Sequence, residues 1–174
     1  RVLPVALLVL GLGGIGAAST TSSVASPSGP PAATKSIIVR PVTADGHAAP
    51  HYKAKPEKGD IVDCGGPAPS PGSVDSNIEE CSPSASYAIA CWKAAKAHHT
   101  LCTRDPSRHK LVLLKYTGTF GTSAPAPAAS RAPLIVILTD GTKCSIRDGG
   151  AWGTLQQHPA WSGSYSCDQH GVVG

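Results

Sequence analysis

Methionine and aromatic residues are what this chain of 174 residues has least of. It contains no methionine and one phenylalanine, and aromatic residues make up 5% of the sequence. The aromatic residues near the C-terminus, Trp152, Trp161 and Tyr165, are therefore expected in the core of a sheet rather than on a carbohydrate-binding platform. The single asparagine, Asn77, is not in an N-glycosylation motif. The abundance of alanine, glycine and proline is typical of a GC-rich bacterial genome.

Motifs that identify enzymes are also missing. No GxSxG, HExxH or P-loop pattern occurs. Gly11–Gly16 matches GxGxxG, but a dinucleotide site needs an acidic residue about 20 positions further on, and the first one here is Asp45. No CxxC occurs either, so a zinc ribbon or a thioredoxin-type redox site is not expected. The sequence predicts no cofactor and no metal site, and it favours a non-enzymatic protein over an enzyme.

One apolar run stands at the start of the chain. Arg1 is followed by the apolar stretch Leu3–Leu10, and small residues then lead to a cleavage-like site at Ser23–Ala25. A membrane-spanning helix needs about 20 apolar residues, and four glycines weaken the second half of this run. Residues 1–25 are therefore predicted to be a cleaved signal peptide, with an uncleaved membrane anchor as the alternative. The protein is expected to be secreted or extracytoplasmic, or membrane-anchored if residues 1–25 are retained.

The six cysteines all follow this segment. Their even number in an exported protein predicts up to three disulfides, among 15 pairings. The pair we favour is Cys144 with Cys167, because both lie in strand-like segments near a common turn region. The candidate disulfide residues are Cys64, Cys81, Cys91, Cys102, Cys144 and Cys167.

The pattern beyond the apolar segment predicts a linker and then one domain. Residues 26–60 are expected to be a flexible Ser/Pro/Ala-rich linker with a short strand at 36–42, and residues 61–174 to be the domain. Ser82–His99 is rich in alanine, with apolar residues at helical spacing, and predicts an amphipathic helix. Cys91 and Cys102 would lie about 16 Å apart on a continued helix, so they can pair only if the helix ends early and the chain turns back.

Runs of branched and apolar residues predict the strands. They occur at residues 110–121, 133–140, 142–146 and 162–167. The second and third are separated by Asp140-Gly141, a tight-turn signal, and are expected to pair. The predicted fold is α+β: one amphipathic helix packed on an antiparallel meander of three to four strands, held by disulfides.

Charge is distributed unevenly behind the net charge of +4. Residues 93–115 contain six basic residues and one acid, Asp105, whereas residues 57–80 contain six acids and one base. The basic segment is a candidate for binding a polyanion or an acidic partner. The alternative is that the two segments neutralise each other or simply solvate the surface. The candidate anion-binding residues are Lys93, Lys96, Arg104, Arg108 and Lys110.

Two further clusters favour structural roles. On a helix, the neighbours His98 and His99 would point about 100° apart, so they would not face one metal ion. Glu79 and Glu80 resemble a glycosidase carboxylate pair, but acids just before a helix are favoured by its dipole.

We therefore expect an exported, non-enzymatic domain that acts by binding at or outside the cell envelope. Its expected partner is an acidic cell-surface polymer or protein, not nucleic acid, and it would touch the membrane only through residues 1–25. One alternative is a small secreted hydrolase, which a concave pocket gathering histidine with aspartate or glutamate would favour. The other is an inhibitor of an extracellular enzyme, with a protruding reactive loop at 122–133 or 153–161.

Overall fold

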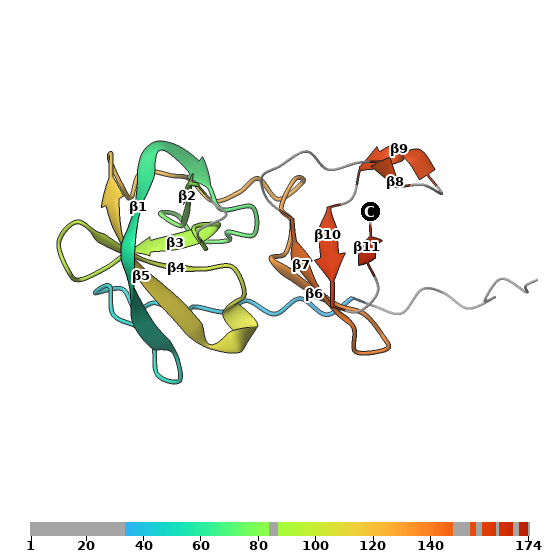
Figure 1. The fold of residues 1–174 in the computed structure, drawn as a ribbon, viewed down its shortest axis with the longest axis horizontal. Helices are drawn as coiled ribbons and strands as arrows, with labels where there is room; N and C mark the ends of the chain where they lie inside the picture. Colours follow the sequence, from blue (N-terminus) through green and yellow to red (C-terminus); the bar gives the residue numbers. More distant parts are fainter. Residues whose placement is uncertain are drawn as a thin grey trace, which may run out of the picture. The chain divides into compact units, whose positions relative to one another are not determined.

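The protein is built from β-strands, as the computed structural model shows (Figure 1). The structure describes residues 34–83, 87–147, 154–155, 158–162, 164–168 and 171–173, and the account below concerns the unit formed by residues 37–174. Over the described ranges there is no α-helix, only the 3-10 turn η2 (Pro106–Arg108). The α+β prediction is therefore wrong. The expected signal peptide at 1–25 lies outside the described residues.

The first five strands form a closed barrel. They are β1 (Lys53–Pro69), β2 (Glu79–Ser82), β3 (Ala90–Lys93), β4 (His99–Thr103) and β5 (Lys110–Thr117). Successive strands are antiparallel, so β1 and β5 run in the same direction and close the barrel as a parallel pair.

The length of β1 allows this closure. Its register shifts against β5 between Pro56 and Ile61, and against β2 between Asp63 and Ala68. Such irregularities bend and twist a strand. One strand of 17 residues can therefore turn around the barrel and pair with both of its neighbours.

The segment predicted to be a helix, 82–99, runs in its described part from the last residue of β2 through β3 to the first residue of β4. Cys91 lies directly opposite Cys102 across β3 and β4, and the two form a disulfide. Tyr87 and His98 have φ values of 70° and 54°, which an α-helix does not allow. Helix propensity is a weak preference that tertiary contacts override, and here the hairpin pairing and the disulfide outweigh the preference of alanine.

Two apolar clusters pack against the barrel wall, one on its inner side and one on its outer side. The interior contains the Cys64–Cys81 and Cys91–Cys102 disulfides together with Val62, Leu114 and Phe120. On the outer side of β3–β5, the side chains of Leu101 and Leu111 pack with residues that precede β1, among them Val42 and Tyr52. The chain from Val42 onward is thus part of the barrel's packing, although it comes before residue 61.

The remaining strands form a second sheet and a hairpin. They are β6 (Ile135–Ile137), β7 (Lys143–Ile146), β8 (Thr154–Leu155), β9 (His158–Ser162), β10 (Tyr165–Cys167) and β11 (Gly171–Val173). The sheet has the order β11-β10-β7-β6, and β8 pairs with β9. The predicted pairing across Asp140-Gly141 is confirmed by β6 and β7. The prediction of a single antiparallel meander is wrong, because β5 pairs with β1 and β4 instead of β6.

All six cysteines are paired. The favoured pair is confirmed, because Cys144 and Cys167 lie directly opposite each other on β7 and β10 and are bonded. Three disulfides fit an extracellular or otherwise oxidising environment. In the described part of the chain, no helix is long and apolar enough to cross a membrane.

Candidate ligand-binding surfaces of the barrel

The structure divides the five candidate anion-binding residues between two ends of the barrel. Strands β3 and β5 both run antiparallel to β4. Lys93, which is opposite Thr100, and Lys96 in the following turn lie at the end where β4 begins. Arg104, Arg108 and Lys110 lie between the end of β4 and the start of β5, at the other end. The chain folds back between these groups, so they do not form one continuous surface.

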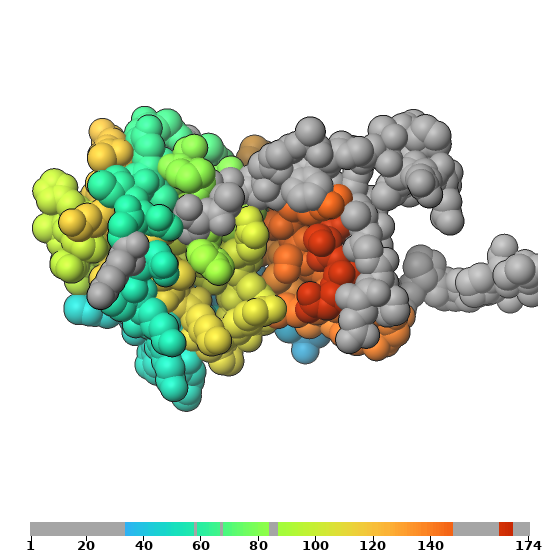
Figure 2. Space-filling view, viewed as in Figure 1, coloured from blue at the N-terminus to red at the C-terminus, as the bar shows by residue number. Residues whose placement is uncertain are grey.

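The second end gains lysines from a strand far away in the sequence. Lys53 on β1 is the direct neighbour of Lys110 on β5, and Lys55 lies two residues further on the same face of β1. All three side chains are exposed, and Figure 2 shows the teal residues of β1 beside the yellow residues of β5. We call Lys53, Lys55 and Lys110 the lysine cluster. Sequence reasoning missed Lys53 and Lys55 because the parallel pairing of β1 with β5 leaves no local signal.

The lysine cluster forms no ion pair with the acids that the structure describes. Within the described part of the chain, no carboxylate lies within 4.0 Å of its three ammonium groups. Like charges directly opposite each other on neighbouring strands are destabilising. The Lys53–Lys110 pairing therefore costs stability and leaves an uncompensated positive charge at the surface.

Arg108, in contrast, is held by a carboxylate. Asp105 accepts a hydrogen bond from Arg108 Nε at 3.0 Å and another from the Nζ of Lys143, and the backbone N–H of Ser107 donates to it at 3.0 Å. Burial alone would raise the pKa of Asp105, but the hydrogen bonds from Lys143 and Ser107 and the charge of Lys143 outweigh it and lower this pKa. Arg104 is half-buried. Neither arginine is as available to a ligand as the lysine cluster.

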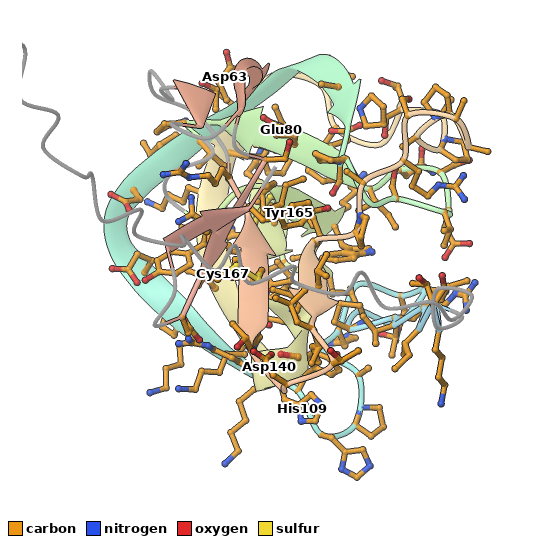
Figure 3. All side chains as sticks on the ribbon, turned by 90° about the vertical axis from the view of Figure 1, so that its right-hand side faces the viewer. Asp63, Glu80, His109, Asp140, Tyr165 and Cys167 are labelled. Atoms are coloured by element: carbon orange, nitrogen blue, oxygen red, sulfur yellow. A yellow bond between two sulfur atoms is a disulfide. The ribbon has the colours of Figure 1, made fainter. Side chains whose placement is uncertain are left out.

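A histidine borders the same end of the barrel. The ring of His109 meets the ring of Tyr52 edge-on at 5.1 Å, and the Tyr52 hydroxyl donates to Pro106 O at 3.0 Å. Figure 3 shows His109 at the opposite end of the view from Asp63 and Glu80. These contacts fix the turn from which β5 and Lys110 begin.

A groove of about 360 Å³ lies on the outer face of β1, β5 and β4. Its centre is a row in which Lys115 on β5 has Ile61 and His99 as direct neighbours on β1 and β4. We call it the mixed-charge groove, because lysines and carboxylates both line it. Its lining residues are Pro56, Glu57, Gly59, Asp60, Ile61, Lys96, His99, Leu113 and Lys115.

The groove meets one condition for a hydrolase but not a second. It gathers His99 with Glu57 and Asp60, which is the combination that the hydrolase alternative requires. Nδ1 of His99 lies 2.7 Å from Ala97 O, so a neutral ring carries its proton there and leaves Nε2 as an acceptor. The described lining residues include no serine, threonine, cysteine or tyrosine, so among them there is no hydroxyl or thiol nucleophile. The arrangement suits ligand binding better than covalent catalysis.

The side chains of His98 and His99 have different surroundings although the two residues are adjacent in sequence, and the same holds for Glu79 and Glu80. His98 is exposed with its ring 6.5 Å from that of Tyr116, whereas His99 faces the groove. Glu79 is fully buried, and its Oε1 accepts from Gly121 N at 2.8 Å and Thr122 N at 3.0 Å. Glu79 and Glu80 lie in β2 and no α-helix follows them in the described residues, so the helix-dipole explanation for this pair is wrong. Among the described residues, no cluster of three or more potential metal ligands occurs.

Glu80 lines a second, acidic groove of about 310 Å³. Its other lining residues include Asp63, Ala68 and Ser82, at the irregular pairing of β1 with β2. Figure 3 shows Asp63 and Glu80 in the same upper part of the view. Two carboxylates at an irregular strand pairing do not by themselves define a site.

Both candidate inhibitor loops are held at some points in their described parts, although residues 127–131 of the first loop are exposed. In 122–133, Ala126 is buried and its N–H donates to Ser73 Oγ at 3.0 Å. Residues 154–155 and 158–162, within or next to the second candidate loop, are the paired strands β8 and β9. Trp152 lies outside the described residues, and the Trp161 side chain is not described. Tyr165 is half-buried, and its hydroxyl donates to Pro133 O at 2.9 Å.

Comparison with known proteins gives no relative from which a function can be transferred, because no family model, curated protein or solved structure matches this chain.

Proposed function

We propose that this protein is an exported, non-enzymatic domain that binds an anionic polymer or an acidic protein surface at or outside the cell envelope. The observation that carries the proposal is the lysine cluster, in which three exposed ammonium groups on neighbouring strands lack an acidic partner among the described residues. The three disulfides support the extracytoplasmic part of the proposal.

The arrangement of the cluster favours an extended anion over a single small one. Lys53 and Lys110 are side by side across two strands, and Lys55 is two residues along β1, about 7 Å away along the strand. A polymer with regularly spaced negative charges can approach all three ammonium groups at once. The structural cost of placing Lys53 opposite Lys110 is then offset when the anion binds.

The test is the affinity of the disulfide-bonded protein for fluorescent poly-L-glutamate, measured by anisotropy at several salt concentrations. Binding should weaken steeply as salt rises, because exposed charges are screened. The variant Lys53→Gln/Lys55→Gln/Lys110→Gln should bind about tenfold more weakly, since exposed ion pairs each contribute up to about 1 kcal/mol.

The matched control removes the same number of charges elsewhere. Lys93→Gln/Lys96→Gln/Lys115→Gln has the same net charge as the test variant but keeps the lysine cluster. It should keep most of the affinity and of the salt dependence. Equal losses in both variants, or binding that does not depend on salt, would show that the lysine cluster is not the binding site.

A further inference from the structure

Beyond the lysine cluster, we infer that the mixed-charge groove binds a short peptide in its dipolar form, with the amino terminus at Glu57 and Asp60 and the carboxylate at Lys96 and Lys115. This site is separate from the lysine cluster and does not depend on it. The inference rests on three observations: the position of opposite charges on opposite walls, the lack of ion pairs between them, and the width of the groove.

Opposite charges line opposite walls. Glu57 and Asp60 come from the part of β1 where its register against β5 shifts, between Pro56 and Ile61. Lys96 comes from the turn between β3 and β4. Strand β5 lies between β1 and β4 and contributes Lys115 to the floor.

The described lysines and carboxylates of the groove do not form ion pairs with each other. Over the described residues, no ion pair within 4.0 Å joins Lys96 or Lys115 to Glu57 or Asp60. A ligand that carries both charges can therefore pair with both walls without first breaking an internal salt bridge. A uniform polyanion would be repelled by Glu57 and Asp60, so it suits this groove less well than a dipolar ligand.

The floor between the walls is partly apolar. Ile61 is 57% exposed, and Leu113 and Pro56 line the groove beside it. When a ligand covers a large apolar side chain that was exposed to water, the removal of apolar surface from water favours binding. The side chains and methylene groups of a peptide would supply that cover.

The distance between the two walls of the groove determines how long a peptide must be to reach both. Neighbouring strands are about 4.8 Å apart, so the walls on β1 and β4 are separated by about 10 Å. An extended peptide spans up to about 3.5 Å per residue, so three residues reach from wall to wall. A single amino acid carries the same two charges but can reach only from β1 to Lys115 on the floor, not to Lys96 on the far wall.

The experiment is a titration of the 15N-labelled, disulfide-bonded protein with trialanine, followed by amide chemical shifts. Trialanine with free termini should give saturable shifts at residues 56–61, 96–99 and 113–115. N-acetylated and C-amidated trialanine should each bind about fivefold more weakly, the size expected for the loss of one exposed ion pair. Free alanine, which cannot reach Lys96, should bind more weakly than trialanine and should not give saturable shifts at residues 96–99.

Variants assign each end of the peptide to one wall. In Lys115→Gln, the effect of amidation should diminish, because only Lys96 is left to pair with the carboxylate, and the effect of acetylation should remain. In Asp60→Asn, the effect of acetylation should diminish and that of amidation remain. The control Lys110→Gln removes one lysine from the same strand but from the lysine cluster, and it should bind trialanine like the unmodified protein.

Three results would overturn the inference. The first is equal binding of free and capped trialanine, and the second is the absence of saturable shifts in the groove. The third is conversion of the peptide to shorter products that is lost in His99→Ala, which would indicate a hydrolase instead of a binding site. Loss of poly-L-glutamate binding in the lysine-cluster variant has no bearing on this titration, so the two proposals fail independently.

Discussion

Asp105 connects the lysine-rich end of the barrel to strand β7. Its carboxylate accepts hydrogen bonds from the N–H of Ser107 in η2, from Arg108 and from Lys143 on β7. Its side chain is only 12% exposed, so these interactions are screened less by water than those of a surface pair. This residue therefore joins the two sheets and also orients the turn that precedes Lys110.

Removal of the Asp105 charge should make stability less sensitive to acid. Because the pKa of Asp105 is lower in the folded protein, its charged form stabilises the fold above the ordinary aspartate pKa of about 4. This contribution is lost as the pH falls through the lowered pKa. Asp105→Asn keeps an acceptor for Ser107 N but should lower the free energy of unfolding at neutral pH by about 1 kcal/mol.

Urea unfolding at neutral and acidic pH measures this effect. The difference between Asp105→Asn and the unmodified protein should shrink as the pH falls. The control Asp75→Asn removes a more exposed ion pair with Arg40, in which the Asp75 side chain is 44% exposed. It should change stability by about 0.5 kcal/mol or less. A difference for Asp105→Asn that stays constant with pH would contradict the explanation.

Glu79 has a structural role that its hydrogen bonds make testable. In Glu79→Ala, the N–H groups of Gly121 and Thr122 lose their acceptor, which should cost about 1–3 kcal/mol of unfolding free energy. Glu79→Gln keeps an acceptor oxygen and should cost less, as measured by chemical denaturation. If both variants cost the same, the charge of Glu79 and not its acceptor oxygen holds the loop.

At the scale of elements, glycine determines how β5 ends against β1. Gly118 has φ of +85°, and a Cβ there would lie 2.4 Å from Gly65 Cα. Gly121 has φ of +92°, but a Cβ there would meet nothing within 4 Å. Both alanine substitutions strain the backbone, whereas only Gly118→Ala also forces β1 away.

Gly118→Ala should therefore destabilise the protein more than Gly121→Ala. The backbone strain alone costs about 1–2 kcal/mol, and overpacking at Gly118 should add about 1–3 kcal/mol. Thermal and urea unfolding of the two variants provide the comparison. Equal losses would mean that β1 and the end of β5 are not in close contact.

The elements that the sequence predicts are those whose strand character is local. The branched apolar runs in β5, β6 and β7 indicate strands without reference to any partner. Strand β1 contains several glycines and prolines, and its strand character depends on pairing with β5, which is distant in sequence. Strand β3 has four residues within an alanine-rich stretch, so a single sequence favours a helix there.

At the scale of the whole molecule, the binding surfaces are assembled by this non-local pairing. The basic segment identified Lys110 as a candidate anion-binding residue. Lys53 lies beside Lys110 only because the barrel closes through the pairing of β1 with β5. The mixed-charge groove likewise brings together residues of the acidic and the basic segments, and the sequence alone did not show where the two segments meet. The residue types were evident from the sequence, whereas their grouping required the topology.

At the same scale, the three disulfides are expected to supply a large share of the stability of the fold. They close loops of 17, 11 and 23 residues. Each loop contributes about 3 kcal/mol in the chain-entropy model, or about 9 kcal/mol together if they add. This is comparable to the entire stability of an ordinary domain, about 5–15 kcal/mol. The single phenylalanine and the absence of methionine leave few large apolar side chains to compensate.

The fully reduced protein should therefore be unfolded at room temperature. In excess phosphine reductant, the near-UV circular dichroism and the cooperative thermal transition should disappear, and all six thiols should become alkylatable. Cys144→Ser/Cys167→Ser should lose only about 3 kcal/mol and keep the barrel, because that bond joins β7 to β10. A cooperative transition that persists with all six thiols alkylated would show that the barrel does not need its disulfides. The protein would then be able to fold in a reducing compartment, and the argument for an extracytoplasmic location would lose its physical basis.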